Sequence, residues 1–189
     1  MSDQVSRLDN VDICPDSDAF QQLWNLNVAP TAQICVWRPF LNKLPTRTNL
    51  VRRVVHLTNI ICPMCNKYDE TVNHLFITCE IAQKIWDRCD KWIGNISVRH
   101  HSIVNHFLSF HMMCLNKRSI VVWKGLWVAI VWEIWKQRNK IAFNDAIIDE
   151  VEVFSLAQLK GWQWAKLKNS EISFSLSNWL LYPGQCLKK

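Results

Sequence analysis

The spacing of apolar residues predicts a mainly α-helical chain. Apolar side chains recur every three or four positions over 80–93 and again over 119–143, which places them on one face of a helix. The second of these segments is expected to be a long buried helix lined by tryptophans, and a further helix is expected over 148–169. Thr46 is a good N-cap for another helix that extends to residue 57.

The remaining segments carry weaker patterns. Short helices are expected over 18–26 and 31–42, and Pro39 should kink or shorten the second of them. The stretch 95–118 has no clear period, and the ending, 173–189, is expected to include a strand. The apolar faces expected for the helices over 31–42 and 46–57 are Ile34, Trp37 and Leu41 in the first and Leu50, Val54 and Leu57 in the second.

Composition supports the helical prediction and adds a charge argument. The 189 residues include 11 tryptophans but only four glycines, which does not suit a turn-rich β-sandwich. The net charge is +6, yet residues 1–20 alone carry −4, so the rest of the chain carries +10. Such an excess favours polyanionic partners such as RNA or DNA, although a merely solubilising surface is the alternative.

Two features bear on the compartment. The opening MSDQVSRLDN has no apolar core typical of a secretory signal, and the eight cysteines are then expected to be reduced thiols or metal ligands. In the apolar segment 119–135, the uncharged run between Lys124 and Glu133 is only eight residues long, against the roughly 20 that span a bilayer. We therefore expect an intracellular protein, nuclear or cytoplasmic, with no membrane partner and no small-molecule substrate.

The densest chemistry lies in CPMCNKYDETVNHLFITC, residues 62–79. Its metal-ligand candidates follow the pattern C-x2-C-x8-H-x4-C and are Cys62, Cys65, His74 and Cys79. A two-residue spacing brings two thiolates to one side of a tight turn, and a five-residue offset on a helix returns the last two ligands to one side. Four such donors suit a tetrahedral, structural Zn²⁺ ion, one per chain, and leave no open position for catalysis.

Other interpretations of these cysteines remain. A redox C-x2-C pair would need a βαβ pattern, which the surrounding sequence lacks, and a chance grouping is the third alternative. Four histidines between 100 and 111 could form a second metal cluster, but their spacing indicates this only weakly. The isolated cysteines, expected to be ordinary thiols, are Cys14, Cys35, Cys89, Cys114 and Cys186.

The order of motifs over about residues 20–94 is similar to that of a known family. The carrying pieces are the segment around Trp24, Trp37-Arg38, LPTRTNL at 44–50, Arg53, CPMC, Glu70-Thr71, HLFITC and Ile85-Trp86. Together they resemble the zinc-binding domain that follows the polymerase domain in plant LINE-type (non-LTR) reverse transcriptases. WEIWKQRNKIAFN at 132–144 is similar, more loosely, to a Trp–Arg–Asn–Phe helix of the trailing segment in such elements. Thr31 and Pro39 depart from the pattern of the family.

The resemblance implies an organisation in four parts and a function. The parts are an acidic disordered leader (1–17), the zinc-binding domain (18–94), a linker (95–118) and a Trp-rich helical region (119–189). In the family such a domain helps to hold RNA or DNA near the polymerase. The residues expected to meet phosphates, without sequence readout, are Arg38, Lys43, Arg47, Arg52, Arg53 and Lys67. Tyr68 could stack on bases, whereas Phe76 is expected in the core.

No catalytic machinery is evident in the sequence. It contains no Tyr/Phe-x-Asp-Asp polymerase motif and no recognisable endonuclease or RNase H pattern of carboxylates. Nucleotidyl transfer would require paired carboxylates that hold Mg²⁺. We therefore expect a detached, non-catalytic, zinc-stabilised nucleic-acid-binding module. The alternatives are a protein-interaction module that docks onto a polymerase domain in trans, or a retroelement remnant without a selected function.

Overall fold

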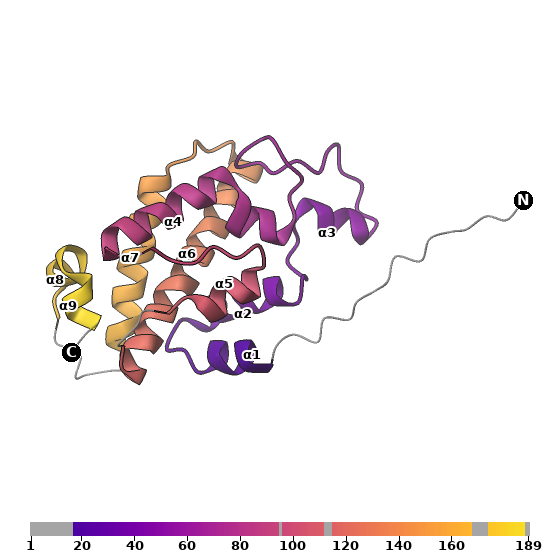
Figure 1. The fold of residues 1–189 in the computed structure, drawn as a ribbon. Helices are drawn as coiled ribbons and strands as arrows, with labels where there is room; N and C mark the ends of the chain where they lie inside the picture. The colour runs from indigo at the N-terminus through magenta and orange to yellow at the C-terminus, as the bar shows by residue number, and fades with distance from the viewer. Residues whose placement is uncertain (1–16, 95, 112–114, 168–173, 188–189) are drawn as a thin grey trace, which may run out of the picture.

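The computed structural model describes residues 17–94, 96–111, 115–167 and 174–187. Within these ranges the chain is helical and has no strand, only an isolated antiparallel bridge between Ile61 and Asp69, which confirms the mainly α prediction (Figure 1). The leader expected to be disordered lies, apart from Ser17, outside the described residues. No helix of the described ranges is both long enough and apolar enough to span a bilayer.

The elements follow one another along the chain as α-helices with one π-helical turn. Their bounds are α1 Ser17–Trp24, α2 Pro30–Phe40, α3 Arg47–Arg52, η1 His74–Thr78, α4 Glu80–Ile93, α5 Ile103–Ser109, α6 Lys117–Asn144, α7 Glu150–Leu167, α8 Leu176–Leu181 and α9 Pro183–Leu187.

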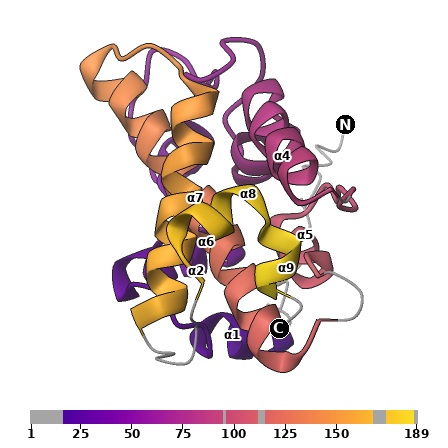
Figure 2. The same cartoon turned by 90° about the vertical axis from the view of Figure 1, so that its left-hand side faces the viewer.

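The long helix α6 forms the centre of the fold, as its apolar pattern predicts. It pairs with α7 in an antiparallel hairpin, and Gly161 lets the two helices approach closely, because a Cβ at that position would lie 3.2 Å from Leu126. Helix α2 packs against α6 and α4 packs against α7, whereas α3 lies at the opposite end of the molecule from α8 and α9 (Figures 1 and 2).

Aromatic side chains from three helices fill the middle of the core. Trp86 of α4 and Trp127 of α6 enclose the imidazole of His106 from α5, with Phe110 packed beside them. The segment expected to be a linker thus contributes α5, which is buried through Ile103, His106 and Phe107. Periodicity missed this helix because it has only seven residues and includes a buried histidine.

Helix α4 matches its prediction closely. Ile81, Ile85, Trp86 and Cys89 are buried, and Gly94 ends the helix in the left-handed conformation, with φ +72°. Only glycine adopts that conformation without steric cost.

Three local predictions are wrong. In α2 the buried face is Ala32, Val36 and Phe40, since Phe40 packs on Phe107 and Trp127, while Ile34 is exposed. Helix α3 begins after its Thr46 cap as expected, but it ends at Arg52, so Val54 and Leu57 lie outside it. The ending forms the short helices α8 and α9 instead of a strand, with Ser175 capping the first. Trp179 anchors this pair because its indole donates to Gln158 O.

Candidate metal centre

Cys62 and Cys65 lie in a tight turn that follows the bridge between Ile61 and Asp69. The backbone N–H of Cys62 donates to Tyr68 O at 2.7 Å, and that of Asn66 donates to Cys62 O at 2.9 Å. Asn66 takes a left-handed φ of +53°, which asparagine tolerates better than most residues. These bonds close the loop and bring both sulfurs to its inner side.

His74 and Cys79 are joined by the π-helical turn η1. The N–H of Cys79 donates to His74 O at 2.8 Å, an i to i+5 bond, so the five-residue offset returns the thiol to the side of the imidazole. The N–H of His74 is itself held by Thr71 Oγ1 at 3.0 Å. The x4 spacing of the motif is therefore the spacing that one π turn requires.

The four predicted ligands meet at one point. Their ligand atoms all lie within 4.8 Å of one another, and His74 Nε2 is 3.3 Å from Cys65 Sγ. Zn²⁺ bonds of roughly 2.0 to 2.3 Å would place tetrahedral ligands at such separations. Three thiols and one imidazole, all shielded from solvent, are the donor set of a closed structural zinc site. The residues therefore fit the ion, and Cys62, Cys65, His74 and Cys79 would hold it.

Contacts among the four candidate ligands shift the pKa values of three of them. The hydrogen bond between Cys62 and Cys79 raises the pKa of Cys62 to about 12, with burial adding to the shift, and the same bond lowers the pKa of Cys79. The hydrogen bond to Cys62 raises the pKa of His74. Zinc binds thiolates and neutral imidazole, so binding at this cluster would release protons and depend on pH.

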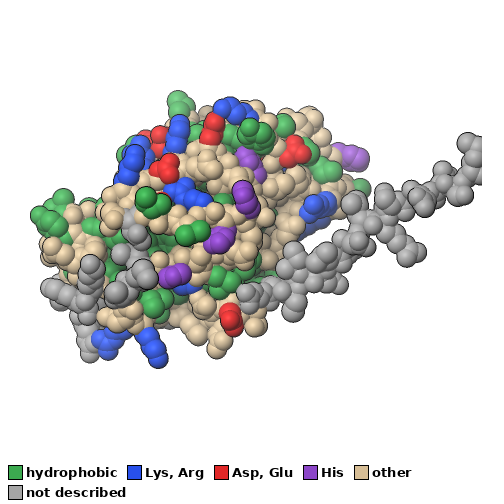
Figure 3. Space-filling model, in the orientation of Figure 1, with side chains coloured by type: hydrophobic (Ala, Val, Ile, Leu, Met, Phe, Trp, Pro, Cys, Tyr) green, Lys and Arg blue, Asp and Glu red, His purple; other side chains and the backbone are tan. Residues whose placement is uncertain are grey.

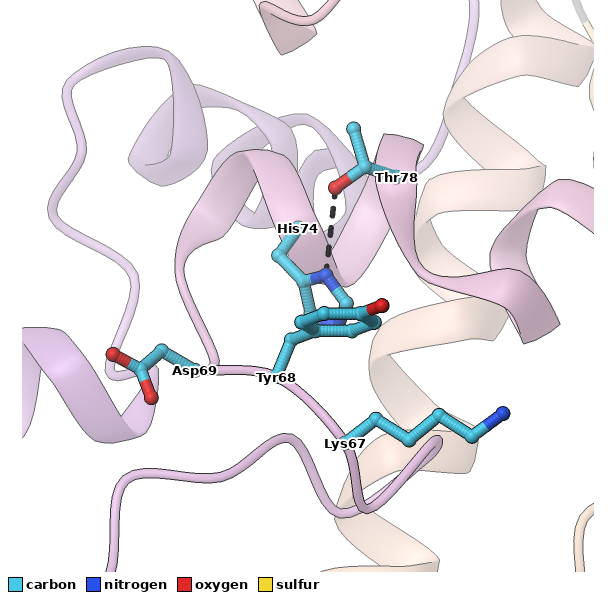
Figure 4. Close-up of a pocket in the computed structure, with 5 residues that line it drawn as sticks. All are labelled: Lys67, Tyr68, Asp69, His74 and Thr78. Carbon is cyan, nitrogen blue, oxygen red and sulfur yellow. Dashed lines mark hydrogen bonds between the residues drawn. The ribbon is translucent and has the colours of Figure 1, made fainter.

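A second layer of side chains surrounds His74. The hydroxyl of Thr78 lies 3.4 Å from His74 Nδ1, and the Tyr68 ring packs over the imidazole at 5.6 Å between centroids (Figure 4). Nδ1 thus faces Thr78 while Nε2 faces the thiols. Tyr68 is 64% exposed and Phe76 is fully buried, as expected for each.

A buried ion pair connects this centre to the distant helix α6. Arg138 Nε and Nη2 each lie 2.6 Å from a carboxylate oxygen of Glu70, the residue that follows the bridge. The first N–H of α3, on Arg47, donates to the same carboxylate at 2.7 Å. Sequence reasoning noted Glu70 and the segment around Arg138 separately but had no signal to pair them.

Only four of the six basic residues predicted to contact nucleic acid lie together in the structure. Arg38, Lys43, Arg52 and Arg53 are exposed at adjoining ends of α2 and α3, and the Arg53 guanidinium donates to Lys43 O at 2.6 Å. Arg47 instead uses its guanidinium to hold Asn59 Oδ1 and Ile61 O. Lys67 lies in the segment 62–79 that carries the four ligands, which we call the knuckle, and pairs with Glu80 at 2.7 Å.

The other candidate ligands do not assemble. Among the described residues, only the group of Cys62, Cys65, His74 and Cys79 brings three or more potential ligands together. His106 is buried, and this burial lowers its pKa to about 4, so it is neutral at physiological pH. Burial raises the pKa of Cys35 to about 12 and that of Cys89 further, which makes both thiols unreactive. Cys14 and Cys114 lie outside the described residues.

Comparison with known proteins supports this centre. A family model described as zinc-binding in reverse transcriptase matches residues 9–86, a range that includes all four ligands. No curated protein and no solved structure gave a match.

Proposed function

We propose that this chain is a zinc-stabilised, non-catalytic module that binds RNA or DNA, because residues 9–86 match the family model of the zinc-binding domain in reverse transcriptase and the four ligands meet at one point. The resemblance to LINE-type elements, and the absence of carboxylate catalytic motifs, support this proposal. We place the module inside the cell, in the nucleus or the cytoplasm, because thiolate ligands require a reducing environment.

One observation carries the proposal. Residues 19–68 contain six basic residues and no acidic residue at all. Over α4, by contrast, cations are matched by anions: Arg99 pairs with Asp87 and Asp90, and basic and acidic side chains alternate there (Figure 3). Arg38, Lys43, Arg52 and Arg53 therefore supply a positive surface that no nearby carboxylate of their own segment neutralises, which suits phosphates.

The test is binding of a fluorescent RNA or DNA oligonucleotide to the zinc-loaded protein at increasing salt. Arg52→Ala with Arg53→Ala should weaken binding and reduce the salt slope by about 1.4 for a single strand. The matched control, Lys117→Ala with Lys166→Ala, removes the same charge from exposed positions on α6 and α7 and should bind normally. Binding no stronger than that of a neutral protein of equal size would reject the proposal.

A second candidate function is docking onto a protein, such as a polymerase domain in trans. The end of α6, the turn after it and the start of α7 expose Phe143 by 75%, Ile147 by 90% and Val151 by 50%. Such an apolar group favours contact with another protein. Self-association or aggregation of the zinc-loaded protein without nucleic acid, relieved by Ile147→Asp, would support this function.

A further inference from the structure

The segment that follows α3 combines exposed cations with exposed aliphatic side chains. Every residue from 51 to 59 is exposed. The valines in this run are 45%, 81% and 42% exposed at Val51, Val54 and Val55, and Leu57 is 38% exposed. We call the six residues Val51, Arg52, Arg53, Val54, Val55 and Leu57 the α3 surface. Much of its aliphatic surface, above all that of Val54, is thus open to solvent.

The backbone holds one of these valines outward at a cost. Val54 has φ +62°, in the left-handed region that β-branched residues rarely adopt. The turn is fixed around it, since the N–H of Val54 donates to Val51 O and that of Val55 to Leu50 O, at 2.9 and 3.0 Å. Strained residues of this kind concentrate at functional sites, and here the strain serves only to end α3 and project an aliphatic side chain.

Resting on the proposed function, we propose that the α3 surface binds single-stranded nucleic acid in preference to a duplex. Its partner must offer closely spaced negative charges for Arg52 and Arg53, together with apolar surface that can cover Val54 and Val55. An unpaired strand offers both, because its base faces are uncovered beside the phosphates. A duplex presents mainly phosphates and sugars there, so it would cover the aliphatic groups poorly. Arginine suits such a site because its planar guanidinium pairs with phosphate and stacks on bases.

Charge complementarity favours nucleic acid as the occupant. Lys43 adjoins this surface because its carbonyl accepts from the Arg53 guanidinium, and Arg38 lies beside it through the bond from Lys43 N–H to Arg38 O at 2.7 Å. Four cations thus adjoin the aliphatic group, with no carboxylate in sequence between residues 19 and 68. A second copy of this chain would bring the same four cations against them and would be repelled.

The decisive variant is Val54→Asn. Asparagine tolerates the left-handed conformation, so this change should leave the melting temperature equal or raise it, while removing the most exposed aliphatic group. With zinc-loaded full-length protein, we expect an unstructured RNA 20-mer to bind at least about tenfold more tightly than the corresponding duplex at equal salt. Val54→Asn, combined with Val55→Ser, should remove most of that preference and leave the duplex affinity and the salt slope unchanged.

The control is Leu181→Ser, which removes an aliphatic side chain that is 68% exposed in α8. Helix α8 lies at the end of the molecule opposite α3 (Figure 1). Equal affinity for strand and duplex, or unchanged strand binding by the valine variant, would overturn the inference while leaving the proposed function intact. Failure to bind either nucleic acid would reject the proposed function itself. A dimer of the free protein that the valine variant abolishes would also overturn the inference, because it would assign the α3 surface to a second copy.

Discussion

Arg138 of α6 holds both carboxylate oxygens of Glu70, 68 residues away in the chain, with two N–O distances of 2.6 Å. Both side chains are buried, and Glu70 also accepts from the first N–H of α3 at 2.7 Å. Three parts of the protein, the knuckle, α3 and the long helix α6, therefore meet at one carboxylate. The position of the knuckle depends on α6 as well as on its own ligands.

Removing one partner of this pair should strongly destabilise the zinc-loaded protein. Arg138→Met leaves the Glu70 carboxylate buried without its counter-charge, which typically costs about 3–5 kcal/mol of unfolding free energy. Urea unfolding at saturating zinc measures the loss. The control is Lys67→Ala, which breaks the exposed pair with Glu80 and should leave the unfolding midpoint unchanged. Equal midpoints for wild type and Arg138→Met would show that the buried pair does not fix the knuckle.

Thr78 should control zinc affinity through His74. When Nε2 binds the ion, Nδ1 carries the proton and donates it to the Thr78 hydroxyl, which keeps the ring in the correct tautomer. Thr78→Val, of nearly equal shape, should weaken zinc binding about tenfold or more, in the range seen for such outer ligands. Competition with a chromophoric chelator measures the affinity. Thr78→Ser keeps the hydroxyl and should bind zinc as tightly as the wild type. Equal weakening of zinc binding in both variants would contradict this role.

Lys124 should give the protein a distinctive alkaline stability profile. Its ammonium is buried beneath α1, where it donates to Gln22 Oε1 and Phe107 O, and burial lowers its pKa to about 8 from an ordinary 10.5. Between these two values the unfolded chain binds the extra proton, so unfolding free energy rises with pH. The gain relative to Lys124→Met should reach about 3 kcal/mol by pH 10.5.

Chemical unfolding of wild type and Lys124→Met at several pH values between 7 and 11 tests this profile. Because both proteins share all other titrating groups, their difference isolates Lys124. A difference that stays constant over the range would show that the lysine is solvated. Lys117 is exposed, so the unfolding free energy of Lys117→Met should differ from that of the wild type by the same amount at every pH.

The sequence predicted the parts of the fold whose determinants are local. The ligand set follows from two short spacings, and α4 and α6 follow from long, regular apolar periods. Local patterns failed where a distant partner or a single backbone angle decides the outcome. The left-handed Val54 ends α3 early, and Phe40 turns α2 toward Phe107 and Trp127.

The ion pair between Glu70 and Arg138 could not be predicted from the sequence for the same reason. Nothing in either segment signals the other, because the pair forms only when α6 packs beside the knuckle. The domain boundaries expected from the sequence stay predictions, although α5 and α6 share one aromatic core with α4.

We propose that Cys62, Cys65, His74 and Cys79 hold one zinc ion whose binding folds the module. Elemental analysis, followed by thermal unfolding before and after chelation, tests it. Structural zinc contributes about 10–16 kcal/mol in finger peptides, more than the stability of many domains. We therefore expect one zinc per chain, unfolding of at least residues 56–94 on chelation, and the same loss in Cys62→Ser and His74→Ala. A metal-free preparation with an unchanged melting temperature would contradict the claim.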